Sequence, residues 1–476
     1  MRIAGIDQGT TGTKAYLFEE TGEARELFRA NHRQFHPGPR RLEHDPTELL
    51  RHVSAAVEAA AKAGAEILGL ANQGETIVAF DRRTGRPLAP AIVWQDARTV
   101  AFVERLREAG AEATTWARAG LPLDPYFSAA KIRWILDHVE EARELRREGR
   151  LAVGTSDAFF LRHLVGRFVT DASTASRTSL MNLATGEWDE ELLALFGVPV
   201  EVLPDILPTA SPFGTVAGHP RLRLAASVVD QQAALYGHGC RQPGGAKITF
   251  GTGAFALAHT GHRPTPDPEA GILATVAWKI GDRPLEYAID GGVYNATSAL
   301  DWARDLGLFR DYGEIDVACE ETALERGLAF VPALSGLGCP YWDRSAAGLW
   351  IGLELGTKRE DLCRSILEGV ALRSAEVLAR FAALAGETER LRIDGGLARN
   401  AAFCRFLAEV TGRIVEVPAF SDLTAFGAAA LAARGAGLEL PPPSQEVRGY
   451  RPERDLRHLL ARFAEAVSRA RGWRPA

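Results

Sequence analysis

Residues 5–14 read GIDQGTTGTK, and residues 248–255, at the head of the second half of the chain, read ITFGTGAF. In each, a tight turn rich in glycine and threonine joins two apolar stretches. Glycine lets the backbone come close to an anion, and threonine hydroxyls and freed N–H groups can donate to phosphate oxygens. One such loop is more often an ordinary hairpin turn. Two of them predict a duplicated fold with a nucleotide held between the halves.

The length of the chain agrees with a duplication. At 476 residues it exceeds the size at which single hydrophobic cores stop growing, so two domains are expected. Strands mixed with helices in each half predict an α/β protein built twice. We place the boundary at Gly237-His238-Gly239, which predicts an N-terminal domain over residues 1–237 and a C-terminal domain over 238–476.

Local patterns predict the main elements of both halves. In the first half, Asp45 and Pro46 mark the start of a helix, because aspartate caps helices and proline suits their first position. The elements expected there are strands at 2–7, 12–19, 67–72 and 76–81, helices at 46–63, 99–109, 131–150 and 231–236, and a loop at 198–222. Those expected in the second half are strands at 247–259, 271–279 and 391–394 and helices at 297–307, 359–385, 399–412, 424–434 and 453–471.

Composition excludes several classes of function. The net charge of −6 and the absence of a long basic run argue against nucleic-acid binding. No apolar stretch approaches the roughly 20 residues that span a bilayer, and a strand that begins at Arg2 leaves no room for a signal peptide. Five scattered cysteines without a Cys-x-x-Cys pair predict a cytoplasmic protein with neither disulfides nor a thiolate metal site.

Asp230 is the first candidate for chemistry. It follows the apolar strand 225–229 and begins a helix, which places a carboxylate at the mouth of the expected cleft between the halves. A general base is needed at that position if a hydroxyl is the acceptor. The alternative is that Asp230 only caps the helix, which is common for aspartate at such a position.

A second group of residues suits a ligand with many hydroxyls. Residues 73–76 read QGET between two strands, so their side chains crown a sheet edge. Trp94 and Tyr126 are aromatic residues with polar neighbours. This mixture fits a polyol, which presents apolar C–H faces and hydroxyl edges. Taken singly, each aromatic residue is more often part of a core.

A third group lies late in the chain. Residues 394–396 read DGG after a strand, and Asn400 opens the next helix. Such a turn lets a flat ligand lie against the backbone. The alternative, a plain tight turn followed by a helix cap, explains the same residues equally well.

The order of these motifs resembles that of the FGGY carbohydrate kinase family, and within it the glycerol-kinase branch, over nearly the full length. The signature-like spans are residues 126–138 and 348–353, the latter leading to 361–362 and 365–368. The other matching runs are 5–11, 43–46, 91–95, 124–128, 175–178, 230–235, 251–253, 336–343 and 394–396. The resemblance implies two actin-like (ribonuclease H-like) domains with a cleft between them that closes on ATP.

The resemblance also implies a role for each matching position. Asp230 becomes the general base, and Asp7 acts on Mg²⁺ through water, since Mg²⁺ keeps much of its hydration shell. The polyol site would comprise Gly74, Glu75, Trp94, Tyr126, Asp230, Gln231 and Phe255. ATP would be held by Thr10, Thr11, Gly12, Lys14, Thr252, Thr297, Asp301, Gly396 and Asn400.

Three departures from the resembled pattern bear on specificity. Glycerol kinases carry arginine where this chain has Gly74, so donors to the substrate hydroxyls are missing and space is left for a larger substrate. Near the adenine, Thr297 and Asp301 stand where the family has glycine and glutamine. Residues 218–228 contain no counterpart of the insertion that forms the inhibitor loop of regulated glycerol kinases.

The sequence therefore predicts ATP-dependent phosphorylation of a small polyol, with glycerol as the leading substrate and Mg²⁺ as cofactor. A kinase for a larger polyol or a ketose is the alternative within the class, and an actin-fold ATPase or sugar sensor is the alternative outside it. A Walker-type kinase is excluded because Gly-x-x-x-x-Gly-Lys-Ser/Thr does not occur. A homodimer and a homotetramer both remain open.

Overall fold

Two large β-sheets organise the computed structural model, which describes residues 1–315, 321–444 and 446–474. The first sheet contains β1 (Arg2–Gln8), β2 (Gly12–Glu19), β3 (Ala24–Asn31), β5 (Ile67–Asn72), β13 (Ala210–Thr215) and β14 (Arg223–Val229). The second contains β15 (Ala246–Phe250), β16 (Ala254–Gly261), β17 (Leu273–Trp278), β18 (Glu286–Val293), β21 (Arg390–Gly395), β22 (Ile414–Pro418) and β23 (Val447–Tyr450).

The two sheets repeat one strand order. In the first, β1 lies between antiparallel β2 and parallel β5, and the sheet continues with parallel β14 and antiparallel β13. In the second, β15 lies between antiparallel β16 and parallel β21, followed by parallel β22 and antiparallel β23. The second sheet adds only the edge strand β17. The expected duplication is confirmed.

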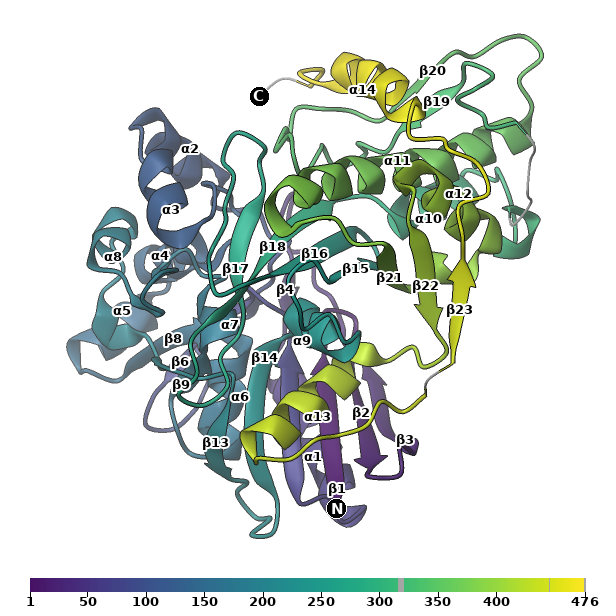
Figure 1. Cartoon of the computed structure of the whole chain (residues 1–476). Helices are drawn as coiled ribbons and strands as arrows, with labels where there is room; N and C mark the ends of the chain where they lie inside the picture. The colour runs from purple at the N-terminus through teal and green to yellow at the C-terminus, as the bar shows by residue number, and fades with distance from the viewer. Residues whose placement is uncertain (316–320, 445, 475–476) are drawn as a thin grey trace.

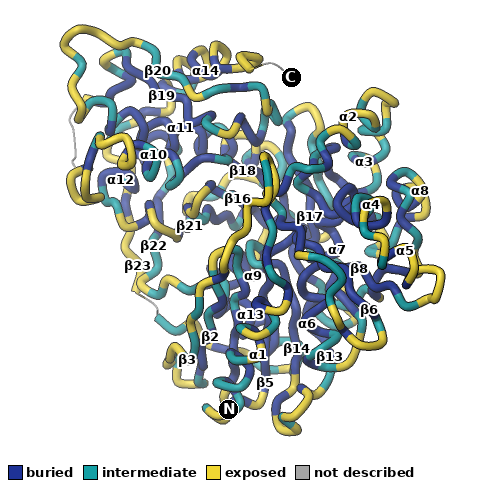
Figure 2. Tube along the Cα trace, turned by 180° about the vertical axis from the view of Figure 1, so that it is seen from behind, coloured by how far each residue is buried: buried dark blue, intermediate teal, exposed yellow. Residues whose placement is uncertain are grey.

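Helices cover both faces of each sheet (Figure 1). The helices of the first half are α1 (Pro46–Lys62), α2 (Val100–Glu108), α3 (Glu112–Ala119), α4 (Ser128–His138), α5 (Glu140–Arg147), α6 (Ser156–Leu164), α7 (Ala172–Ala175), α8 (Glu190–Phe196) and α9 (Asp230–Gly237). Those of the second half are α10 (Thr297–Asp305), α11 (Arg359–Ala385), α12 (Ala401–Thr411), α13 (Leu423–Gly435) and α14 (Leu459–Ala470). In Figure 2 the central strands are buried, whereas the edge strands β3 and β23 and many loops carry exposed residues.

Small sheets complete the fold. One of four strands contains β4 (Glu43–His44), β6 (Ile77–Asp81), β7 (Ala91–Ile92) and β8 (Leu151–Thr155). The three two-stranded sheets pair β9 (Val169–Asp171) with β12 (Asp205–Leu207), β10 (Met181–Asn182) with β11 (Glu187–Trp188), and β19 (Ala329–Val331) with β20 (Leu349–Ile351).

The helices α9 and α13 cross between the two sheets, each lying on the sheet of the other half. Helix α13 packs on β1, β5 and β14, and α9 packs on β15, β16 and β17. Glycines permit the close approach: a Cβ added to Gly5 or Gly69 would lie 2.0 Å from a carbonyl oxygen of α13, and one added to Gly427 would lie 1.8 Å from the Ala233 oxygen of α9. No side chain fits at these positions without moving a helix.

The crossing makes Gly427 a sensitive position. We expect Gly427→Ala to lower the free energy of unfolding by about 1–3 kcal/mol, because the new methyl group forces α9 and α13 apart. This holds although alanine favours a helix by about 1 kcal/mol over glycine. Denaturant titration measures the loss, and Gly449→Ala is the control because a Cβ there meets nothing within 4 Å. Equal stabilities of the two variants would contradict the prediction.

Several predicted elements agree with the structure. The hairpin of β1 and β2 pairs Asp7 with Lys14, and α11 runs over the predicted residues. Asp45 caps α1, with its carboxylate accepting from the Thr47 N–H at 2.9 Å. Within residues 1–315, 321–444 and 446–474, no helix has the length and apolar character to cross a bilayer.

Three predicted elements were wrong. The helix expected over 131–150 is two helices, because Val139 is extended (φ −100°, ψ 106°) between α4 and α5, both of which pack on one core. The loop expected over 198–222 contains β12 and β13, and β13 tolerates Pro212 because it is an edge strand. The last helix begins at Leu459 instead of residue 453.

The prediction that the cysteines form no disulfides can be checked only for the cysteines that the structure describes. Among the described residues the cysteines are buried and form no disulfide; they are Cys240, Cys339, Cys363 and Cys404. Cys319 lies outside the described residues.

The domain boundary at residues 237 and 238 stays a prediction, since α9 ends at Gly237 while α13 of the second half lies on the first sheet.

Candidate active site

Both glycine-threonine segments form short hairpin loops at the carboxyl ends of central strands. Residues 9–11 connect β1 to β2, where the Gly9 N–H donates to the Gly12 oxygen at 2.9 Å. Residues 251–253 connect β15 to β16 directly after the pair of Phe250 and Ala254. Thr252 is exposed. In open α/β sheets ligands bind at such strand ends.

Three aromatic residues, which come from both halves, lie beside the first loop. We call Trp94, Tyr126 and Phe255 the aromatic wall. The ring centroid of Trp94 lies 5.3 Å from that of Tyr126 and 5.9 Å from that of Phe255, both edge-to-face. The Trp94 Nε1–H donates to the Thr10 hydroxyl oxygen at 2.9 Å. All three side chains are partly exposed, so none is simply core, and the wall is tied to the predicted phosphate loop.

A buried lysine, to which the sequence assigned no role, hydrogen-bonds to the backbone of two residues of the aromatic wall. Lys131 of α4 is 0% exposed, and its Nζ donates to the carbonyl oxygens of Pro125 (2.6 Å), Tyr126 (2.5 Å) and Trp94 (3.3 Å). Burial lowers the pKa of Lys131 to about 7. The signal in the sequence was a lysine on the apolar face of a predicted helix.

Glu75 is held in a strained position by an arginine that the sequence did not single out. Its φ of 57° is unusual for a residue with a side chain. Its Oε1 accepts from Arg177 Nε at 2.6 Å, and Arg177 Nη2 pairs with Asp290 Oδ2 of the second half at 2.9 Å. All three residues are buried. The sequence signal for Asp290 is a carboxylate inside the apolar stretch of β18.

Asp230 lies at the carboxyl end of β14 as the first residue of α9. Val229 holds the N-cap position and gives no side-chain cap, while the Asp230 Oδ1 accepts from the Gln231 N–H at 2.6 Å. Burial raises the pKa of Asp230 to about 7, and the charges of Asp7 and Glu75 act in the same direction, while Lys247 opposes them. A carboxyl group with such a pKa suits proton acceptance near neutral pH.

Asp7 lies at the end of β1 near the other carboxylates. Burial raises the pKa of Asp7 to about 6, with Lys14 acting against the shift and Asp422 and Asp394 adding to it. Accumulated negative charge of this kind is compensated by a cation. The described residues contain no cluster of three or more His, Cys, Asp or Glu arranged to hold a metal. A single carboxylate fits Mg²⁺, which is bound through few protein ligands, substrate phosphates and water.

Lys14 forms an ion pair across the halves. Its Nζ lies 2.6 Å from Asp422 Oδ1, and the Tyr16 hydroxyl donates to Asp422 Oδ2 at 2.8 Å. Sequence reasoning missed Asp422, which comes directly before α13. The predicted contact of Lys14 with phosphate would be made from this pair.

The predicted adenosine residues divide into two groups. Thr297 and Gly396 lie together: the Thr297 hydroxyl donates to the Gly251 oxygen at 2.5 Å, and a Cβ on Gly396 would lie 3.3 Å from the Thr297 methyl carbon. Asp301 instead accepts from the Tyr312 hydroxyl at 2.7 Å and pairs with Arg304. Asn400 caps α12 through Phe403 N–H at 2.7 Å, the alternative that the sequence had left open.

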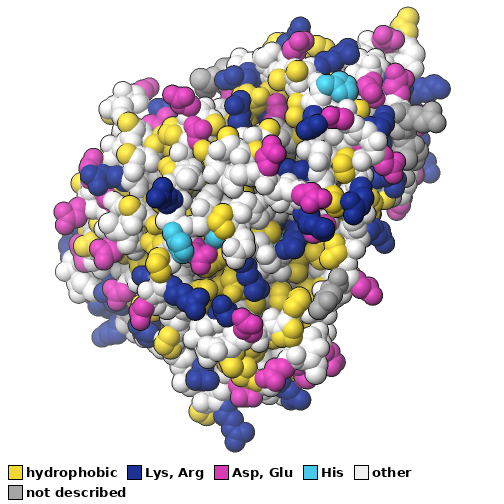
Figure 3. All heavy atoms as spheres, viewed as in Figure 1, with side chains coloured by type: hydrophobic (Ala, Val, Ile, Leu, Met, Phe, Trp, Pro, Cys, Tyr) yellow, Lys and Arg dark blue, Asp and Glu magenta, His cyan; other side chains and the backbone are white. Residues whose placement is uncertain are grey.

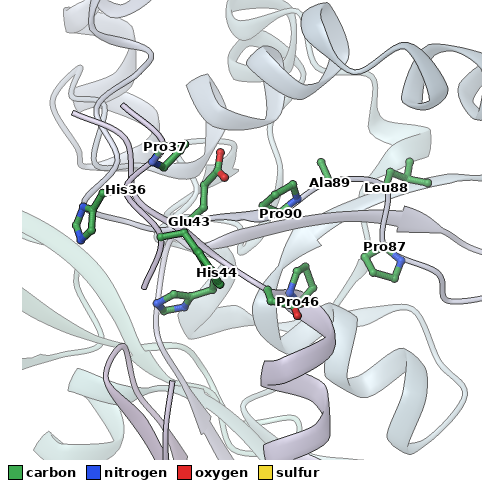
Figure 4. Close-up of a pocket in the computed structure, with 11 residues that line it drawn as sticks. His36, Pro37, Glu43, His44, Pro46, Pro87, Leu88, Ala89 and Pro90 are labelled. Atoms are coloured by element: carbon green, nitrogen blue, oxygen red, sulfur yellow. The ribbon is translucent and has the colours of Figure 1, made fainter. Parts of the chain in front are cut away.

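Other surface features lie apart from these residues. A pocket of about 620 Å³ is formed by β4, the start of α1 and residues 87–90 (Figure 4), and its described lining residues include none of the predicted site residues. On the face in Figure 3, acidic and basic side chains are interspersed. The pocket adds nothing to the arrangement at the strand ends.

Comparison with known proteins gives the family. Models of the FGGY family of carbohydrate kinases match both halves, with the N-terminal domain over residues 2–227 and the C-terminal domain over residues 246–436. The chain belongs to the FGGY carbohydrate kinases. The fold of this FGGY kinase is accordingly the actin-like, two-domain α/β fold, and the protein is an ATP-dependent kinase.

Individual relatives align over the full length of this FGGY kinase. A glycerol kinase of Alkalilimnicola ehrlichii is 42% identical over 489 aligned positions, which cover 99% of this chain and 98% of the relative. The crystal structure of Plasmodium falciparum glycerol kinase with ADP is similar with a TM-score of 0.89 and 29% identity, covering 98% of both chains. A xylulose kinase of Rhodospirillum rubrum is similar with a TM-score of 0.85 and 25% identity, covering 98% of this chain and 99% of that one.

Proposed function

We propose that this FGGY kinase transfers the γ-phosphoryl group of ATP to a hydroxyl of glycerol and so forms glycerol 3-phosphate. The observation that carries the proposal is the bond from Trp94 Nε1 to the Thr10 hydroxyl. It joins the aromatic wall, which suits the C–H face of a polyol, directly to the loop that suits phosphate. The full-length similarity to glycerol kinases supports glycerol as the acceptor.

In the proposed mechanism each group has one task. Asp230 accepts the proton from the attacking hydroxyl, and its raised pKa suits that task. Glu75 and Gln231 bind the remaining hydroxyls, while the aromatic wall excludes water from the acceptor. Arg177, held by Glu75 and Asp290, fixes the carboxylate of Glu75. Positioning and charge neutralisation supply most of the rate in phosphoryl transfer.

The nucleotide would lie between the two hairpin loops. Thr10, Thr11, Gly12 and Lys14 would bind phosphates from the first half and Thr252 from the second, with Gly396 and Thr297 against the adenosine. When bound, Mg²⁺ neutralises charge on the phosphates, and Asp7 would hold it through water. The reducing cytoplasm is the proposed compartment, in keeping with buried cysteines that form no disulfide in the described part of the chain.

A larger polyol or a ketose is the second candidate for the acceptor. The observation that favours it is Gly74, which stands beside Glu75 where the resembled glycerol kinases carry an arginine side chain. The similarity to a xylulose kinase shows that the fold also serves a five-carbon sugar kinase. The reaction class is the same for both candidates.

A coupled assay that measures ADP release tests the proposal. The acceptors compared are glycerol, dihydroxyacetone, tetritols, pentitols and ketopentoses, with a reaction lacking any acceptor as the control. Glycerol should give the highest kcat/KM. Equal ADP release with and without acceptors would indicate an ATPase, and activity with a pentitol or ketopentose alone would replace glycerol by the second candidate.

The pH dependence follows from the pKa of Asp230. The base must be ionised to accept a proton, so activity is lost as the pH falls below the pKa of about 7. We expect kcat/KM for glycerol to fall about tenfold per pH unit below pH 7. Initial rates between pH 5 and 9 measure the profile. A profile that stays level down to pH 5 would show that activity does not depend on the ionisation of a group with a pKa near 7.

A further inference from the structure

Lys247 is a fully buried cation close to the proposed polyol site. It lies on β15, the strand that leads into the second phosphate loop, and it is 0% exposed. A buried ammonium group is costly unless it is paired and hydrogen-bonded. The proposed mechanism gives this lysine no task, so its partners are informative.

The partners of Lys247 are a residue of the proposed polyol site and a residue of its own strand. Its Nζ donates to Gln231 Oε1 at 2.5 Å and to Thr249 Oγ1 at 2.9 Å. Thr249 lies opposite Asp394 where β15 pairs with β21, and Asp394 is the first residue of the turn proposed to border the adenosine. The charged and titratable groups facing Lys247 from neighbouring elements are Asp230, Asp290, Asp394 and Cys240.

The contact with Lys247 determines which way the Gln231 amide points. An ammonium group has three donors and no acceptor, so only the carbonyl oxygen of the amide can face it. The Gln231 Nε2 is therefore directed away from Lys247. No described residue accepts a hydrogen bond from this nitrogen, and the Gln231 side chain is partly exposed. A donor is thus free next to Asp230, where a polyol hydroxyl would need one.

We propose that Lys247 is a positioning residue of the polyol site, which locks the Gln231 carboxamide so that Nε2 donates to a substrate hydroxyl beside Asp230. The inference rests on the proposed function, because it gives Gln231 a polyol to bind. Lys247 itself does not touch the substrate. A purely structural lysine would neutralise the surrounding carboxylates without any effect that depends on Gln231.

A double-mutant cycle separates these two roles. The variants are Lys247→Met, Gln231→Met and the double variant, each measured for kcat and for KM of the best polyol and of ATP. Each single variant should raise the polyol KM roughly 3–10-fold, the effect of one hydrogen bond, and leave the ATP KM within about twofold. The double variant should resemble Lys247→Met, because residues that act through one contact are not additive.

Gln231→Glu tests the orientation without removing the buried lysine. One carboxylate oxygen keeps the bond to Lys247, so the fold is retained, while the other replaces the outward donor by an acceptor. The polyol KM should rise at least as much as in Gln231→Met. This variant keeps the inference testable if Lys247→Met does not fold.

Arg373→Met is the matched control for the loss of a buried cation. Arg373 is 0% exposed; it pairs with Glu376 and donates to the Cys339 oxygen at 2.6 Å, and neither partner is a residue of the proposed site. The Arg373→Met variant should be less stable than the wild type, while its KM for the polyol is unchanged. Additive effects in the cycle, or an unchanged polyol KM in Gln231→Glu, would overturn the inference about Lys247. Failure of the proposed function is a separate result, since wild-type enzyme would then phosphorylate no polyol of the panel.

Discussion

Replacing Asp230 by asparagine is expected to lower kcat by roughly 10²–10⁴ while the KM for the polyol changes only a few-fold. Asparagine keeps the shape of the side chain and removes its ability to accept a proton. The loss therefore falls on the chemical step rather than on binding. The prediction follows from the place of Asp230 at the end of β14 and from its pKa of about 7.

The control for Asp230→Asn is a buried carboxylate outside the proposed site. Asp157 of α6 is 0% exposed, and burial raises its pKa to about 6, with the charge of Asp171 adding to the shift. Asp157→Asn should keep kcat within a few-fold of wild type. Steady-state kinetics with saturating ATP measure both variants. Turnover of Asp230→Asn within tenfold of wild type would remove Asp230 from the role of base.

Replacing Gly74 by arginine is expected to raise kcat/KM for glycerol by about tenfold to a few hundredfold. The gain is bounded by one or two charged hydrogen bonds to vicinal hydroxyls. The backbone at Gly74 is not in the left-handed region, and an added Cβ would lie 3.1 Å from Val229 Cγ2, so Val229 must shift slightly to accommodate it. For a longer polyol, the same side chain should lower kcat/KM by filling its space.

Gly74→Ala separates the new donors from the new contact with Val229, and it should change kcat/KM for glycerol only a few-fold. Arg177 is the guanidinium already near Glu75, but Nε and Nη2 bind carboxylates, and Nη1 is enclosed by protein. We therefore do not expect Arg177 to supply the hydrogen-bond donors that an arginine at position 74 would give. A wild type that is already efficient with glycerol and unimproved by Gly74→Arg would show that Gly74 does not determine the substrate.

The sequence predicted those parts of the molecule that depend on short segments. The two glycine-threonine loops were found because each is a hairpin, whose turn residues and flanking strands are adjacent in the chain. Asp45 as a cap and the span of α11 are local in the same sense. Trp94 and Tyr126 were found because polar residues accompany each of them, whereas Phe255 followed only from the family resemblance, and the contacts among the three were not foreseen.

The missed parts depend on pairings between distant segments. The group of Glu75, Arg177 and Asp290 joins three elements, and no local pattern predicts which carboxylate an arginine will meet. The break at Val139 was missed because apolar residues on both sides of it pack into one core, so the apolar pattern gives no sign of the interruption. The ion pair of Lys14 and Asp422 joins residues from the two ends of the chain.

The crossing of α9 and α13 also sets the order in which the protein can be completed during synthesis. The first sheet is made from residues 2–229, yet the helix that covers one of its faces is α13, which ends at Gly435. The apolar side chains on that face are thus without their cover until most of the chain has left the ribosome. Exposed apolar surface of this kind is prone to aggregate, so we expect the first half to be vulnerable to aggregation until α13 has been synthesised.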